Sequence, residues 1–272
     1  MLSQSLRPIY NSIMGVLLLC VSCCAFADNA NHYDNLIQHL QLQYLAEPTA
    51  QRAQYLAILQ SGSDAEQLEY IENIQQSVAL FWRQKQVALA FDTIDGHASV
   101  IDKNIALEPA VDDYLGVINY LRKLMWLAET QEWQAIEPGG LLRPGDGHPS
   151  IKQISLRLWL LGDANEYLAD EVVYLPTLAQ SVKRFQSRHG LTPDAVIGPK
   201  TLFWLNQTPQ QRAILLAKSF VEKTAYLSQL PQPYLLINIP AFDMVLIDNN
   251  QVVLSSKVIV GQPARQTPVM TG

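Results

Sequence analysis

Apolar residues recur at helical spacing along the first half of the chain, which predicts helices there. Pro48, Gly62 and Gly96 interrupt the pattern at points where helices are expected to end. Three apolar stripes define the predicted helices, the third of which is expected to end near Trp133: Leu36, Leu40, Tyr44 and Leu45; Leu68, Ile71, Ile74, Val78 and Phe81; and Tyr114, Ile118, Leu121, Leu124 and Met125. Residues 28–136 are therefore interpreted as a helical, scaffold-like region.

The pattern changes after residue 233, where apolar runs of strand length replace the helical spacing. The runs begin near Tyr234, Phe242 and Gln251, and the Asn249-Asn250 pair suits a hairpin turn because asparagine tolerates left-handed geometry. Residues 137–148 are rich in glycine and proline and are interpreted as a linker, and residues 207–233 as a helical connector. Together these segments predict an α+β fold, mainly helical, with an antiparallel β segment at 234–272.

A dense motif occupies positions 182–206, with the sequence VKRFQSRHGLTPDAVIGPKTLFWLN. Gly190 suits the position after a helix, where left-handed geometry costs little without a Cβ, and Gly162 follows an upstream apolar helix in a weaker copy of this arrangement. The order of Phe-Gln, Gly-Leu, Asp and Gly-Pro-x-Thr resembles the peptidoglycan-binding domain 1 family, small helical modules of bacterial cell-wall enzymes. Ala195 departs from that pattern, because the family has glycine there, and its turn is expected to be strained or reshaped.

The resemblance implies a helical module at residues 149–206 that binds peptidoglycan. Its substrate contacts are assigned to four side chains, Arg184, Gln186, Arg188 and Asp194. Basic residues suit the carboxylates of peptidoglycan, and the module carries five of them: Arg157, Lys183, Arg184, Arg188 and Lys200. Exposed ion pairs contribute only about 0–1 kcal/mol each, so a solvated helix face is the alternative interpretation of these charges.

The first 27 residues have the features of an export signal. Arg7 is followed by a short apolar run, and Ala25-Phe26-Ala27 forms a cleavage site, which predicts a periplasmic protein. All three cysteines lie in this segment, and lipoprotein anchoring is not favoured because no leucine stands three places before Cys23 or Cys24. No membrane span is expected after cleavage. The net charge of −6 argues against nucleic acid as a partner, since a basic face would be needed.

The β segment resembles the opening of the L,D-transpeptidase (YkuD) catalytic domain, in the large multidomain form found in Gram-negative bacteria. The resemblance rests on Asn238-Ile239-Pro240-Ala241-Phe242, Val260-Gly261 and Thr267-Pro268. It implies acyl transfer by a cysteine thiolate beside a histidine, in a motif that follows these strands. The sequence ends at Gly272, before that motif, so no catalytic residue is assigned and the chain is expected to be inactive alone. Ser255 and Ser256 are interpreted as ordinary strand residues.

The sequence offers no candidate residues for metal catalysis or for a catalytic pair of carboxylates. His32 and His39 are seven positions apart and are interpreted as a solvated pair, so no metal and no cofactor is expected. Glu66, Glu69 and Glu72 are interpreted as a charged helix face rather than a catalytic pair.

Three functions stay open at this point. One is an exported, non-catalytic, truncated relative of the transpeptidases that binds peptidoglycan. The second is an N-terminal fragment of an active transpeptidase whose catalytic part is encoded separately. The third is a periplasmic scaffold that docks other cell-wall enzymes as partners.

Overall fold

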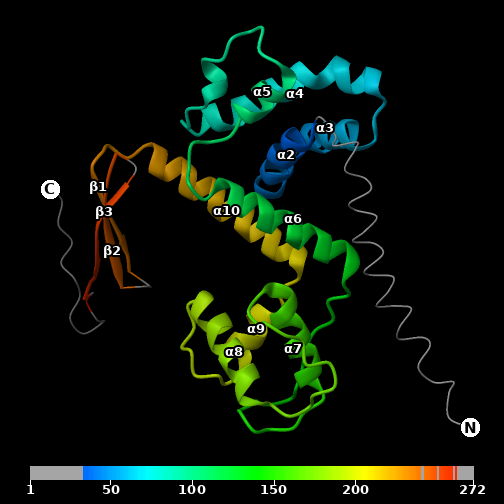
Figure 1. The fold of residues 1–272 in the computed structure, drawn as a ribbon, viewed down its shortest axis with the longest axis vertical. Coiled ribbons are helices and arrows are strands. Elements are labelled where there is room, and N and C mark those ends of the chain that lie inside the picture. The colour runs from blue at the N-terminus through cyan, green and yellow to red at the C-terminus, as the bar shows by residue number, and fades with distance from the viewer. Residues whose placement is uncertain (1–32, 240–241, 250, 260, 262–272) are drawn as a thin grey trace, which may run out of the picture. The chain divides into compact units, whose positions relative to one another are not determined.

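The computed structural model describes residues 33–239, 242–249, 251–259 and 261 (Figure 1). The predicted export signal and its cysteines lie outside these residues. The described residues divide into two compact units, the first comprising those up to Ile118 and Phe220–Ala225, the second Asn119–Ser219 and those from Tyr226 onward. The division falls inside two long helices, α6 (Tyr114–Thr130) and α10 (Pro209–Ser228).

The first unit is helical, as the apolar stripes predict. It contains α2 (Asp34–Ala46), α3 (Ala50–Ser61), α4 (Asp64–Gln84), the short 3₁₀ helix η1 (Ala90–Asp92) and α5 (Val100–Ile105). The side chains of Thr49 and Ser63 cap α3 and α4 by accepting backbone N–H groups of the first turn. The inward stripe of these helices is fully buried, with the largest side chains being Trp82, Phe81, Leu36, Leu40, Leu42, Leu59 and Ile74.

Leu68 is the exception to the predicted stripe of α4, since it is 66% exposed. The first turns of α4 contact α3 through Gln67 instead, whose Nε2 donates to the carbonyl of Leu59 at 3.1 Å. The carboxylates of Glu66, Glu69 and Glu72 are exposed, in agreement with the predicted charged face.

A residue of α10 completes the core of the first unit. The ring of Phe220 lies edge-on to Trp82, with centroids 6.4 Å apart, and 6.0 Å from the ring of Tyr114. Phe220 is only 3% exposed. The ammonium of Lys223 also pairs with the carboxylate of Asp113 at 2.6 Å. Residues 220–225 therefore belong to the core of a unit whose remaining residues precede 119.

His39 is buried at 1% exposure, so the prediction of a solvated histidine pair is wrong for this residue. Its Nε2 donates to the carbonyl of Asn104 at 3.1 Å, and its Nδ1 accepts from the hydroxyl of Tyr114. The Asn104 side chain in turn accepts from Nε2 of Gln75 at 2.8 Å. This network joins α2, α4, α5 and α6, and it satisfies the buried imidazole in its neutral form. Burial lowers the pKa of His39 to about 4.

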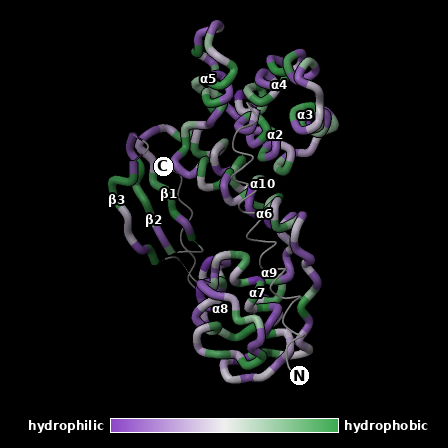
Figure 2. The backbone as a smooth tube through the Cα atoms, turned by 45° about the vertical axis from the view of Figure 1, so that its right-hand side comes forward, coloured by the Kyte–Doolittle hydropathy of each residue, from purple (hydrophilic) through white to green (hydrophobic). Residues whose placement is uncertain are grey.

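The second unit contains α7 (Ser150–Leu161), α8 (Pro176–Arg188) and α9 (Pro199–Asn206), followed by α10. Proline occupies the first position of α8, α9 and α10, where its missing N–H costs no helical hydrogen bond. Hydrophobic and hydrophilic segments alternate along these helices, as amphipathic packing requires (Figure 2).

The helix-then-glycine arrangement found twice in the sequence gives the same helix ending twice. Gly162 and Gly190 have φ of 86° and 67°, the left-handed geometry predicted for Gly190. At the end of α8, the N–H of Leu191 donates to the carbonyl of Gln186 and that of Gly190 to Ser187. The end of α7 is bonded in the same way through Asp163 and Gly162. Both helices therefore close with a Schellman motif.

The β segment forms a three-stranded antiparallel sheet in the order β1 (Tyr234–Asn238), β2 (Asp243–Asp248) and β3 (Gln251–Lys257). Asn249 has φ of 49°, in agreement with the predicted turn. Large aliphatic side chains of the edge strands stay half exposed, among them Leu235 at 52% and Val253 at 57%. The helices and this sheet confirm the predicted α+β class. Among the described residues, none of the helices is long and apolar enough to cross a bilayer.

Candidate functional site

The segment predicted to be a linker, residues 137–148, is hydrogen-bonded to the rest of the second unit. Leu142 and Ile197 exchange two backbone hydrogen bonds of 3.1 and 2.9 Å. Further along, the N–H of His148 donates to the carbonyl of Val172 at 2.8 Å. The glycines and prolines of this segment thus shape an extended strap that packs on the module, and the hydrogen-bonded unit begins before Pro149.

Gln186 sits at the centre of the motif and is 1% exposed. Its Nε2 donates toward the carboxylate of Asp194 (3.0 Å), the carbonyl of Val196 (3.0 Å) and the hydroxyl of Thr201 (3.2 Å). Its Oε1 accepts the buried N–H of Ala195 at 2.9 Å. Both polar atoms of the Gln186 side chain, which was assigned to substrate contact, are therefore hydrogen-bonded within the turn between α8 and α9 and to α9.

Ala195 adopts a left-handed backbone, with φ of 62°, and is buried at 1% exposure. The turn thus keeps the left-handed geometry that suits glycine although Ala195 carries a Cβ, so it is strained rather than reshaped. Two hydrogen bonds fix its peptide groups, one from the Ala195 N–H to Gln186 and one from the hydroxyl of Tyr174 to the Ala195 carbonyl at 2.8 Å. Tyr174 is fully buried, and the motif gave no indication of its role.

Asp194 is exposed but is committed to the same turn. Its carboxylate accepts the N–H of Val196 at 2.8 Å as well as the Gln186 amide. The backbone hydrogen bond from Val196, followed by the bond from Gln186, lowers the pKa of the Asp194 carboxyl. It therefore stays ionised and holds the turn.

His189 packs within the motif. Its ring lies 4.1 Å from the Phe185 centroid and 4.9 Å from that of Trp204. Nδ1 donates to the carbonyl of Phe185 at 2.7 Å, and Nε2 accepts from the guanidinium of Arg212 at 3.2 Å. Burial, together with Arg188 and Arg212, lowers the pKa of His189 to about 4.

Arg184 and Arg188, the other two residues assigned to the site, meet at Asp163. The guanidinium of Arg188 forms two hydrogen bonds to the Asp163 carboxylate, at 3.1 and 2.6 Å. Nε of Arg184 donates to the Asp163 carbonyl at 2.9 Å. Burial opposes the charge of Arg188, but Asp163 outweighs it and raises the pKa of Arg188. The Asp163 carboxylate is therefore paired with Arg188, whereas Arg184 bonds only to the backbone carbonyl of Asp163.

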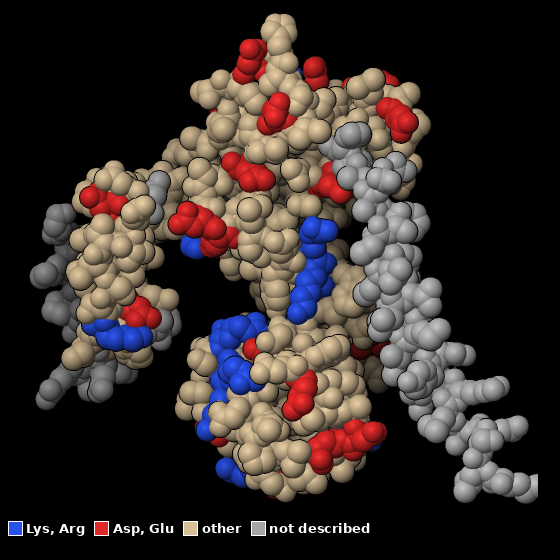
Figure 3. Space-filling model, viewed as in Figure 1, with Lys and Arg blue, Asp and Glu red and all other residues tan. Residues whose placement is uncertain are grey.

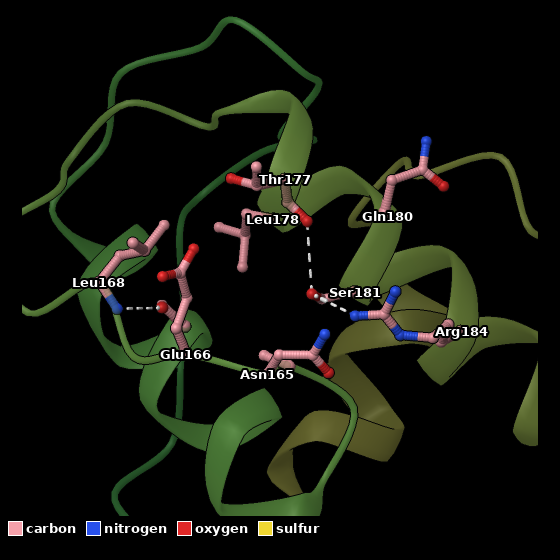
Figure 4. Close-up of a pocket in the computed structure, with 10 residues that line it drawn as sticks. Asn165, Glu166, Leu168, Thr177, Leu178, Gln180, Ser181 and Arg184 are labelled. Atoms are coloured by element: carbon pink, nitrogen blue, oxygen red, sulfur yellow. Dashed lines mark hydrogen bonds between the residues drawn. The ribbon is translucent and has the colours of Figure 1, made fainter.

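A cavity of about 240 Å³ opens beside Arg184, between α8 and the segment that follows α7 (Figure 4). Its lining combines both charges with amides, hydroxyls and an apolar floor, contributed by Ser155, Ala164, Asn165, Glu166, Leu168, Thr177, Leu178, Gln180, Ser181 and Arg184. No motif in the sequence pointed to residues 164–168, because they lie in an irregular segment between two helices.

The four predicted site residues thus form two separate groups. Gln186 and Asp194 are bonded to one another and stabilise the turn. Arg184 and Arg188 share Asp163, and only Arg184 lines the cavity.

The basic character predicted for the module is less marked in the structure. Arg157 is 2% exposed, so it is no surface cation. The guanidinium of Arg157 stacks on Trp133 and donates to the carbonyl of Leu205 at 3.1 Å. Figure 3 shows acidic and basic side chains together on the face of the module in view, so that face does not carry a single sign of charge.

In the part of the chain that the structure describes, no group of three or more histidine, cysteine or acidic residues could hold a metal ion.

Sequence comparison places this geometry in a known class of domain. Residues 147–205 match the family model of a peptidoglycan binding domain. The match spans α7, α8 and α9 and the turn that Gln186 stabilises, and it begins two residues before the predicted module. This peptidoglycan-binding module supports a cell-wall location for the chain. No curated protein matches the chain in sequence.

Proposed function

We propose that this chain is an exported protein related to the L,D-transpeptidases. Its module binds peptidoglycan and so keeps the protein at the cell wall in the periplasm. The observation that carries the proposal is the match of residues 147–205 to a peptidoglycan binding domain, over a fold in which the motif residues Gln186, Asp194 and Thr201 are joined by hydrogen bonds.

The relation to transpeptidases rests on the β segment. Three antiparallel strands lie where the resemblance expects the first strands of that catalytic domain, and β1 ends at Asn238, the first residue of the shared motif. Several residues of that motif, including Pro240 and Ala241, lie outside the described residues.

Binding is tested by co-sedimentation of the full chain, without residues 1–27, with purified sacculi. We expect the protein to pellet with intact sacculi and to stay in the supernatant after the sacculi are digested by a muramidase. An unrelated acidic protein serves as the control for trapping. Equal pelleting of both proteins would remove the case for specific binding.

Catalysis is tested separately. Residues 28–272 contain no cysteine, so we expect no acylation of this polypeptide by a carbapenem. A covalent adduct in the intact mass would contradict this expectation.

A further inference from the structure

The cavity beside α8 presents two opposite charges from different segments of the module. Arg184 comes from α8 and Glu166 from the segment after α7, and Figure 4 shows them on different sides of the space between. Nε and Nη2 of Arg184 donate to Asp163 and Ser181, at 2.9 and 3.0 Å. Nη1 of Arg184 and the carboxylate of Glu166 have no hydrogen-bond partner among the described residues. Each charge therefore has capacity for a ligand.

The walls of this cavity are held in place by internal hydrogen bonds. The N–H of Leu168 donates to the hydroxyl of Ser155 at 3.1 Å, which ties the irregular segment to α7. On the opposite wall, the hydroxyl of Ser181 donates to the carbonyl of Thr177 and accepts from Arg184. A ligand would thus meet groups that are already ordered, which reduces the entropy lost on binding.

We propose that this cavity binds the peptide stem of peptidoglycan, with a stem carboxylate on Arg184 and the amine of its diamino acid on Glu166. The proposal rests on the peptidoglycan-binding function proposed above. Charge-assisted hydrogen bonds of this kind are roughly twice as strong as neutral ones.

The remainder of the lining fits a peptide better than a glycan chain. The side chains of Asn165 and Gln180 offer amides for a peptide backbone, and Ala164, Leu168 and Leu178 form an apolar floor for alanine methyl groups. None of the ten lining residues is aromatic, so the cavity lacks a flat ring on which a sugar could stack. The chemistry of the site therefore favours the stem over the sugar backbone.

The test measures the affinity of the full chain for a synthetic tetrapeptide stem with a diamino acid at its third position, by calorimetry. We expect Arg184→Gln and Glu166→Gln each to weaken binding about tenfold or more, the loss typical of one charged hydrogen bond. Lys218→Gln, which removes an exposed charge from α10 outside the cavity, is the control and is expected to leave affinity unchanged.

Glu166→Gln also guards against misfolding, because Glu166 is exposed and makes no internal hydrogen bond among the described residues. Wild-type affinity in both cavity variants would overturn the proposal, and so would an equal loss in Lys218→Gln, which would indicate diffuse charge attraction. Tighter binding by Glu166→Gln would overturn the assignment of the amine.

A second arm separates this proposal from the proposed function. Glycan strands stripped of their stems are expected not to bind. If wild-type protein pellets with sacculi but binds stripped glycan and not the tetrapeptide, the function stands and the stem assignment fails. If wild-type protein does not pellet with sacculi and does not bind the tetrapeptide, both fail.

Discussion

Replacing Gln186 by alanine would remove the side chain on which the turn between α8 and α9 depends. The buried N–H of Ala195 would lose its acceptor, which costs about 1–3 kcal/mol. The Val196 carbonyl would keep Thr201 but lose the amide of Gln186, at about 1 kcal/mol more. We therefore expect the module to lose about 2–4 kcal/mol of stability, a large part of the roughly 5–15 kcal/mol that holds a domain folded.

Amide hydrogen exchange is the appropriate assay, because it reports on residues 178–205 without the rest of the chain. Gln180→Ala is the matched control, since Gln180 is exposed on the same helix and makes no internal hydrogen bond among the described residues. We expect it to change stability by less than about 0.5 kcal/mol. The same exchange rates in both variants would refute the role given to Gln186.

Three further predictions follow from the described contacts. Gly190→Ala should destabilise the module by about 1–2 kcal/mol in thermal unfolding, because Gly190 has a left-handed backbone that a residue with a Cβ adopts only with strain. An added Cβ meets no atom within 4 Å at Gly190 or at Gly147, so the two sites differ in backbone geometry alone. Gly147 has no positive φ, and Gly147→Ala should therefore have little effect. Acid should destabilise the first unit: the pKa of His39 is about 4 when folded and 6.5 when free, so stability present above pH 6.5 is lost as the pH falls toward 4, by roughly 3 kcal/mol. Urea unfolding at pH 7 and 4.5 checks this, and a His97→Gln control should retain the dependence. The half-exposed edge strand β3 favours pairing between chains, so we expect the wild-type chain to self-associate in sedimentation velocity. Val253→Lys should reduce this association, because a charge on an edge strand opposes strand pairing, and unchanged association would contradict this.

The sequence predicted elements well wherever the local pattern determined them. Gly190 marks a helix end in the structure, because the left-handed backbone geometry there depends on the residue itself. Ala195 was expected to be strained because one missing glycine is visible in a motif. The β strands and the turn between β2 and β3 likewise followed from apolar runs and an asparagine pair.

The remainder depended on contacts between distant residues. His39 was placed in solvent, since its burial requires Asn104 and Tyr114, which are far away in sequence. Gln186 was assigned to a ligand because a motif shows that a residue matters without showing what it contacts. The cavity was missed since Glu166 and Arg184 are brought together only by the packing of α7 and α8.

The position of Phe220 affects how this protein is made. The ring that closes the core of the first unit against Trp82 and Tyr114 is synthesised only after the whole peptidoglycan-binding module. Until then, an emerging chain holds its helical region without its last core residue, while the module is already complete and free to fold. A fragment that stops at residue 136 would remain in that unfinished state, with two aromatic rings lacking the side chain that covers them. Expression of the helical region by itself therefore requires that residues 220–225 be supplied, for instance by joining them to the end of α6 through a short connection in place of the module.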